Sequence, residues 1–150
     1  MSFSAAGMSF VVAGLLATIR SGAEELTRPA TFMEVCGTHT HAIAAFQATQ
    51  HKLADMATKI ELSRLITYKA AWNYDQGRID PKLTSMAKMY AARTAVEVDD
   101  EAIQLLGGYG YMTEYEVERF YRDAKITEIY EGTKEIQKNT IASAVIGKLK

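Results

Sequence analysis

Cysteine is nearly absent from this chain of 150 residues, which contains only Cys36. A lone cysteine excludes a disulfide within the chain and is typical of proteins kept in a reducing compartment, so we expect a cytoplasmic location. A bridge to another molecule or a reactive thiol stays open.

An excess of charge of one sign is also absent, because 17 Lys and Arg stand against 18 Asp and Glu. Nucleic-acid-binding proteins usually need a basic face, so we expect no nucleic-acid partner. The apolar run MSFVVAGLLATI, residues 8–19, is too short to cross a bilayer and no Lys or Arg precedes it. We therefore expect neither a signal peptide nor a membrane partner.

Proline is scarce, with two residues, and strand-like alternation, internal repeats and low-complexity stretches are missing. The composition, 48% apolar and 23% charged, is that of a helix-rich globular protein. A chain of this length buries roughly 70% of its unfolded surface. The composition and the length together therefore predict one all-α domain over residues 1–150.

Apolar residues at helical spacing predict a helix over about residues 10–26, an irregular link over 29–45, and a long helix over 46–76 that ends at Gly77. The apolar face of the long helix is expected to hold Leu53, Met56, Ala57, Ile60, Ile66, Ala70 and Ala71.

Asp80 and Pro81 predict the start of a third helix that runs to Gly107 and Gly108. Its expected core residues are Leu83, Met86, Ala87, Tyr90, Ala91, Val98, Ala102 and Leu105. A short helix over 116–124 and a last helix from Thr133 follow, and the last helix is expected to bury Ile136, Ile141, Val145 and Ile146. The whole predicts an up-and-down antiparallel helical bundle.

Glu131 is the most suggestive candidate for chemistry, because it stands between Tyr130 and Gly132 just before the last helix. A carboxylate among bulky apolar groups can abstract a carbon-bound proton, and a glycine lets a ligand approach the backbone closely. The alternative is a surface carboxylate that the dipole of the following helix attracts.

The stretch QLLGGYGY, residues 104–111, ends the third helix with an amide side chain and exposed backbone N–H groups. These groups suit a phosphate or an adenine edge, although glycine also simply ends helices. Charged residues on the short helix predict a solvated stripe of ion pairs, and the tyrosines are expected to anchor the core or an interface. The stripe contains Arg119, Arg122, Lys125, Glu116, Glu118 and Asp123, and the tyrosines are Tyr109, Tyr111, Tyr115, Tyr121 and Tyr130.

Cys36, His39 and His41 lie within six residues and offer ligands that suit zinc or iron. A structural zinc site usually has four protein ligands, and only His51 lies near enough in sequence to add to the set. Metal binding is therefore an alternative hypothesis only.

Three segments resemble the C-terminal helical domain of the acyl-CoA dehydrogenases: AFQATQHKLADMATKIELSRLITYKAAW, QLLGGYGYMTEYEVERFYRDAKITEIYEGT and EIQKNTIA. They occur in the family's order between about residues 44 and 150. The resemblance implies an FAD-dependent enzyme that dehydrogenates acyl-CoA thioesters and passes electrons to a redox partner, and it implies a homo-oligomer.

By this resemblance Glu131 corresponds to the base that removes the α-proton, and Gly132 lines the thioester site. The expected FAD contacts are Phe46 and Gln47, the adenine-diphosphate segment Gln104, Leu105, Leu106, Gly107 and Gly108, and the helix start Thr133, Lys134 and Glu135.

Residues 1–43 depart from the family. Relatives have further N-terminal and middle β-domains, and the stretch CGTHTHAIAAFQ replaces a segment that carries an arginine for the FAD pyrophosphate. Residues 15–43 instead resemble the start of HypD-type hydrogenase-maturation proteins, in which Cys36 and His39 would match functional positions. We therefore expect a HypD-like leader over 1–43, a dehydrogenase-like domain over 44–150, and weak or no activity from the chain alone. A non-catalytic helical module that oligomerises is the alternative, with Met33, Met56, Met86, Met89 and Met112 as adaptable contacts.

Overall fold

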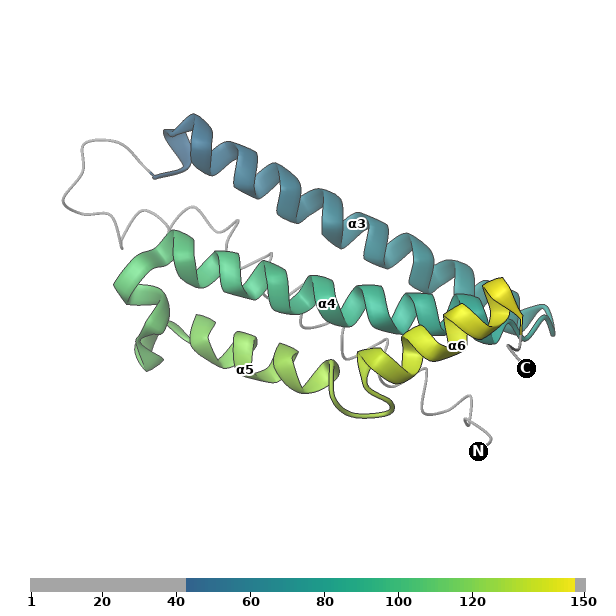
Figure 1. Ribbon diagram of the computed structural model, residues 1–150. Helices are drawn as coiled ribbons and strands as arrows, with labels where there is room; N and C mark the ends of the chain where they lie inside the picture. Colours follow the sequence, from purple (N-terminus) through teal and green to yellow (C-terminus); the bar gives the residue numbers. More distant parts are fainter. Residues whose placement is uncertain (1–42, 148–150) are drawn as a thin grey trace.

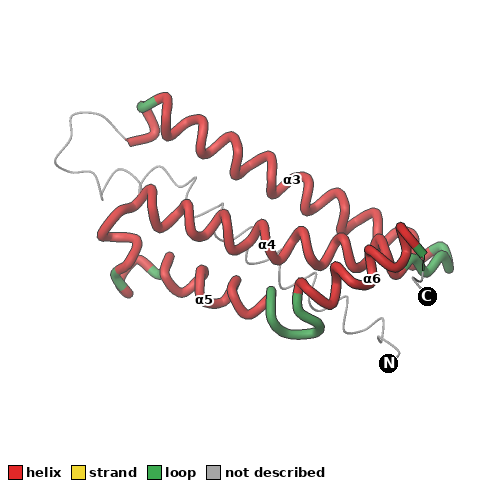
Figure 2. Tube along the Cα trace, viewed as in Figure 1, coloured by secondary structure: helices red, strands yellow, loops and turns green. Residues whose placement is uncertain are grey.

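A computed structural model describes residues 43–147 of the chain. Within that range every regular element is helical, as Figure 2 shows, so the all-α prediction is confirmed. The α-helices are α3 (Gln47–Asp75), α4 (Pro81–Leu106), α5 (Val117–Thr127) and α6 (Lys134–Ile146). Three short 3₁₀ helices join them: η1 (Ile43–Ala45), η2 (Gly107–Tyr111) and η3 (Thr113–Tyr115). The helix predicted over 10–26 and most of the link over 29–45 lie outside the described residues.

Helix α4 is central in the described part of the bundle, with α3, α5 and α6 all packed against it (Figure 1). α3 and α4 run antiparallel, whereas α5 and α6 follow one another along α4 in the direction of α3. The up-and-down arrangement is thus confirmed for these helices. None of the described helices combines the length and the apolar character that a membrane crossing needs.

The start of α4 follows the sequence prediction. Asp80 lies in an extended conformation at the N-cap, and its Oδ1 atom accepts hydrogen bonds from the backbone N–H groups of Lys82 (3.0 Å) and Leu83 (3.1 Å). Pro81 occupies the first helical position, where its missing N–H costs no helical hydrogen bond. Local chemistry therefore fixes where the central helix begins.

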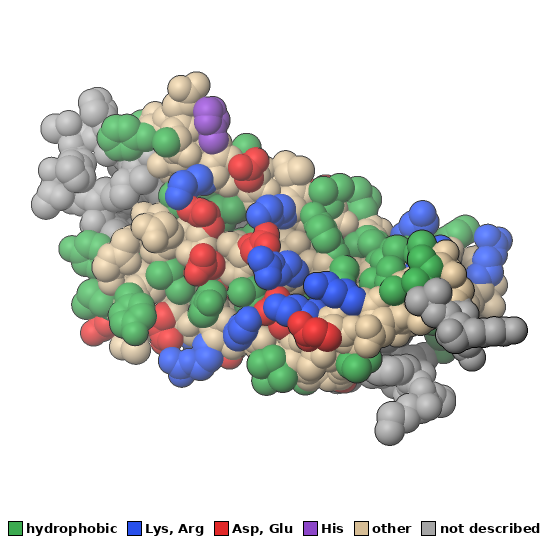
Figure 3. Space-filling view, in the orientation of Figure 1, with side chains coloured by type: hydrophobic (Ala, Val, Ile, Leu, Met, Phe, Trp, Pro, Cys, Tyr) green, Lys and Arg blue, Asp and Glu red, His purple; other side chains and the backbone are tan. Residues whose placement is uncertain are grey.

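The core is built from small residues where α3 and α5 meet α4. Ala91, Ala95, Val98 and Ala102 of α4 pack with Met56 and Ile60 of α3 and with Val117 and Ala124 of α5. Small side chains let helices approach closely, which explains why alanine dominates this interface. Salt bridges flank it: Lys52 pairs with Glu101, and Lys59 with Glu97 at 2.7 Å. Figure 3 shows acidic and basic side chains interleaved over this middle band.

Two predictions about burial are wrong. On α6, Ile136, Val145 and Ile146 are 54%, 65% and 62% exposed, and Gln137 is buried instead. On α3, Ala57 and Ala71 are exposed, and Thr49, Ser63 and Thr67 are buried. Each helix presents only one face to α4, and hydrophobicity alone did not identify which face that is.

None of the five predicted tyrosines is fully buried, so they do not anchor the core of the described residues, and their role at an interface stays a prediction. Tyr111 is 82% exposed, and Tyr109 packs edge-to-face on Tyr115 with ring centroids 5.3 Å apart. The charge stripe on α5 is confirmed by the pairs Arg122–Glu118 (2.9 Å) and Arg119–Glu116 (3.4 Å). These two pairs lie at the surface, where ion pairs contribute little to stability.

Candidate functional site

Glu131 lies in the turn that joins α5 to α6, at the side of α4. Its side chain is exposed, and its backbone adopts the left-handed conformation with a φ of 54°. Gly132 follows with a φ of 96°, a value that L-residues rarely adopt. Two consecutive positive φ values reverse the chain sharply and present the carboxylate on the surface of the turn.

Two side chains from neighbouring helices hold the backbone of this turn. Lys88 of α4 donates a hydrogen bond from Nζ to the carbonyl oxygen of Gly132 at 2.8 Å. Gln137 of α6 donates from Nε2 to the same oxygen at 3.3 Å and to the carbonyl oxygen of Glu131 at 3.4 Å. The sequence analysis missed both residues. A lysine between the inward-facing Ala87 and Met89 was the available signal.

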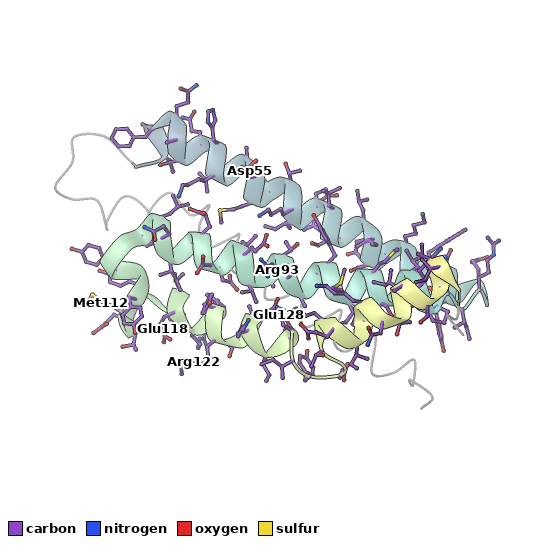
Figure 4. The ribbon with its side chains drawn as sticks, in the orientation of Figure 1. Asp55, Arg93, Met112, Glu118, Arg122 and Glu128 are labelled. Carbon is purple, nitrogen blue, oxygen red and sulfur yellow. The ribbon has the colours of Figure 1, made fainter. Side chains whose placement is uncertain are left out.

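The charges around the turn come from α4, from the end of α5 and from the turn itself. Burial lowers the pKa of Lys88, and the negative charges of Glu131 and Glu128 oppose that shift. Burial also raises the pKa of Tyr130, with Glu131 adding to the effect. Figure 4 labels Glu128 at the end of α5 and Arg93 on α4 beside it. Glu128 is buried and accepts a hydrogen bond from Lys125 Nζ at 2.5 Å.

Other predicted site residues lie close to Glu131 in the chain. Thr133 occupies the N-cap position of α6, although its side chain makes no capping hydrogen bond, and Lys134 and Glu135 form the first turn. The backbone N–H of Glu135 and the hydroxyl of Thr133 lower the pKa of the Glu135 carboxyl. Glu131 to Glu135 thus run from the turn into the first turn of α6, and their roles stay predictions.

The remaining predicted residues lie at the far end of the bundle. Gln104, Leu105 and Leu106 end α4, and Gly107 and Gly108 open η2. Gln104 is 16 residues beyond Lys88, which on a helix rising 1.5 Å per residue is about 24 Å. The described residues therefore form two separate surfaces, one around Glu131 and one at the end of α4.

Phe46 and Gln47 lie at the start of α3, at the same end of the bundle as the end of α4 (Figure 1). The salt bridge between Lys52 and Glu101 ties the start of α3 to the end of α4. Phe46 is 56% exposed, and Gln47 is also exposed.

The end of α4 is open to solvent. Gln104 presents an exposed amide, and a Cβ atom added at Gly107 or Gly108 would meet nothing within 4 Å. Backbone N–H groups in such an open segment can be approached by a phosphate or an adenine edge.

Metal binding through Cys36 and His39 stays a prediction, because both residues, like His41, lie outside the described part. Over residues 43–147 no three His, Cys, Asp or Glu side chains gather in a way that could hold a metal ion.

Comparison with known proteins places residues 10–146 in a match to the family described as "Acyl-CoA dehydrogenase, C-terminal domain". The chain is 49% identical over 100 residues to cyclohexane-1-carbonyl-CoA dehydrogenase of Geobacter metallireducens, an alignment that covers 67% of this chain and 26% of that protein.

Solved structures agree with the sequence match. Butyryl-CoA dehydrogenase from Megasphaera elsdenii superposes with a TM-score of 0.81 at 36% identity, over 93% of this chain and 36% of that one. A glutaryl-CoA dehydrogenase from Mycobacterium smegmatis in complex with FADH2 gives a TM-score of 0.83 at 26% identity, over 93% and 36%. The chain thus spans about a quarter to a third of the length of these relatives.

The match from residue 10 onward also covers residues 15–43. The resemblance of that segment to HypD-type proteins therefore gains no support, and the segment is better assigned to the same family as the rest of the chain. The division of the domain at residue 43 stays a prediction.

Proposed function

Since this chain belongs to the acyl-CoA dehydrogenase family, whose C-terminal domain it matches, we propose that it serves FAD-dependent α,β-dehydrogenation of an acyl-CoA thioester. Glu131 takes the proton from the α carbon. FAD, when bound, supplies the acceptor for the hydride that leaves the β carbon. The thioester is oxidised by two electrons to its 2-enoyl form, and those electrons pass to an electron-transfer partner.

The observation that supports this proposal best is the geometry of the turn before α6. Glu131 presents an exposed carboxylate on a backbone whose two positive φ values are held by hydrogen bonds from α4 and α6. A general base must be accessible to its substrate and fixed in orientation. Gly132 follows this carboxylate directly, and we assign it to the lining of the thioester site. The place of its missing side chain is taken by Gln137.

The second surface carries the proposed FAD contacts. We assign Gln104, Leu105, Leu106, Gly107 and Gly108 to binding the adenine-diphosphate half of FAD. Phe46 and Gln47 are assigned to another contact with FAD, and Thr133, Lys134 and Glu135 to a contact at the start of α6. The two surfaces lie about 24 Å apart along α4. This separation agrees with two different FAD contacts, of which the one at the end of α4 is made with FAD of a neighbouring subunit.

The 150 residues by themselves are expected to show weak or no turnover, because they span about a quarter to a third of their relatives. The test is therefore a chimera, in which residues 44–150 replace the corresponding part of the Megasphaera elsdenii butyryl-CoA dehydrogenase. Anaerobic mixing with butyryl-CoA should bleach the flavin absorbance.

In the same chimera Glu131→Gln should slow the bleaching by about 10²–10⁴-fold, the range for loss of a general base. Glu61→Gln is the control, since Glu61 is exposed on α3 and pairs only with Arg64. A chimera that binds FAD and acyl-CoA but bleaches equally fast with Glu131→Gln would refute the assignment of the base.

A second proposal follows from the outward face of α3. Leu62, Leu65, Tyr68 and Trp72 follow one another at spacings of three and four residues and are 49–56% exposed. An apolar stripe of this kind marks an interaction surface, and we propose that a second copy of the chain covers it. Sizing by light scattering should find an oligomer for the wild type and a smaller species for Leu65→Lys with Trp72→Lys. A wild-type monomer at high micromolar concentration would refute this proposal.

The cytoplasmic location inferred from the single cysteine stays a prediction that fractionation of the source cells would check.

A further inference from the structure

Lys88 makes a contact that its position in the chain does not suggest. It lies in the first half of α4, 44 residues before Gly132, yet its Nζ atom donates to the Gly132 carbonyl oxygen at 2.8 Å. The side chain is half-buried. Hydrogen bonds from charged donors are stronger than those between neutral groups, so the ammonium group is a strong partner for this carbonyl.

The turn that receives this hydrogen bond is strained. The left-handed conformation is unfavourable for a residue other than glycine, and Glu131 adopts it with a φ of 54°. Such a conformation persists only where its surroundings over-determine it. Three hydrogen bonds reach the turn from outside, one from Lys88 and two from Gln137.

The two donors differ in what they can do. The Gln137 bonds are long, at 3.3 and 3.4 Å, and come from α6, which begins only one residue after Thr133. The bond from Lys88 is shorter, at 2.8 Å, and comes from the central helix, so it links the turn directly to α4. Its ammonium group also interacts with the charges of Glu131 and Glu128.

We propose that Lys88 is a positioning residue: its ammonium group, bound to the Gly132 carbonyl, fixes the Glu131–Gly132 turn in its left-handed conformation and so sets the direction of the Glu131 carboxylate. The importance of this for catalysis rests on the proposed function, in which Glu131 is the base. The conformational part stands independently, because it concerns only residues of the 150-residue chain.

The first test is NMR on the intact chain labelled with ¹⁵N and ¹³C. The HN–Hα coupling of Glu131 reports its φ. The exchange rates of the Tyr130 and Gln137 amides, which donate to the carbonyl oxygens of Ile126 and Thr133 on either side of Glu131, report how often the turn opens. In Lys88→Met we expect the coupling to change and the exchange to accelerate about tenfold or more, while Lys88→Arg, which keeps a charged donor, stays closer to the wild type. Lys82→Met is the matched control, because Lys82 lies on the same helix six residues earlier.

The proposal would be overturned if the Glu131 coupling and the amide exchange rates of Lys88→Met matched those of the wild type. It would also be overturned if Lys88→Met and Lys88→Arg gave the same values. If Lys88→Met does not fold, titration of the Lys88 side chain in the folded protein decides instead. The midpoint should lie below the usual 10.5, and Glu131→Gln should lower it further, because one of the two carboxylates that favour the ammonium is removed. A midpoint at the usual value that does not change in Glu131→Gln would show that Lys88 is solvated and is not a positioning residue. None of these measurements needs flavin or thioester, so they remain decisive if the proposed dehydrogenation is refuted.

Discussion

The Nε2 atom of Gln137 lies 2.8 Å from the place that a Cβ atom on Gly132 would occupy. Gln137 is buried and donates from that same atom to the carbonyl oxygens of Glu131 and Gly132, so it cannot move aside without losing both hydrogen bonds. Glycine is thus required at position 132 for two reasons: its φ of 96° disfavours other residues, and Gln137 occupies the space that a side chain would need.

Gly132→Ala should therefore destabilise the protein by about 1–3 kcal/mol, the cost of a positive φ for alanine plus the displaced amide. Urea denaturation measures this free energy of unfolding. Gly77→Ala is the matched control, since Gly77 has a φ of 71° but nothing within 4 Å of the added Cβ. Equal losses at both positions would mean that contact with Gln137 contributes nothing.

The cap of α4 gives a second prediction. Asp80→Ala removes the acceptor of two backbone N–H groups and should cost about 1 kcal/mol in the free energy of unfolding. Asp80→Asn keeps an acceptor oxygen and should cost much less. Thermal unfolding followed by circular dichroism would separate the two variants, and an alanine variant as stable as the asparagine one would contradict the capping role.

Asp99 on α4 makes stability depend on pH. It is 3% exposed, and burial, with a smaller contribution from the charge of Asp123, raises its pKa from 3.8 to about 7. A carboxyl whose pKa is raised on folding binds its proton more tightly in the folded state. Stability is therefore lost as pH rises from about 4 to about 7, and the full loss, on the order of 4 kcal/mol at most, is present above that window.

Asp99→Asn should remove this dependence, so its stabilising effect in urea denaturation should be larger at pH 8 than at pH 5. Asp100→Asn is the control, because Asp100 is the exposed neighbour on the same helix. The same effect of Asp99→Asn at both pH values would show that Asp99 is ionised throughout.

Helix limits followed from the sequence because local chemistry sets them. Asp80 and Pro81 start α4, and Gly77 ends the segment after α3 with a φ of 71°. The position of Glu131 just before the last helix was also predictable, because the family resemblance and the adjacent Gly132 both indicated a turn there.

The inward faces were not predictable to the same degree. On α6 the buried residue is Gln137 and Ile136 is exposed. The side-chain amide of Gln137 faces inward because it donates hydrogen bonds to the backbone carbonyl oxygens of Glu131 and Gly132. Lys88 reaches Gly132 across 44 residues, a distance in sequence that no local pattern spans. Contacts of this kind depend on how α4 and the turn meet in three dimensions.

The central claim is that Glu131 removes the α-proton, and exchange of that proton tests it most directly. The chimera with butyryl-CoA dehydrogenase, incubated anaerobically with butyryl-CoA in D₂O, should incorporate deuterium at the α carbon. Glu131→Gln should reduce the rate of incorporation at least about 100-fold while the protein still binds the thioester. Undiminished α-deuteration by a Glu131→Gln chimera that binds butyryl-CoA would contradict the account.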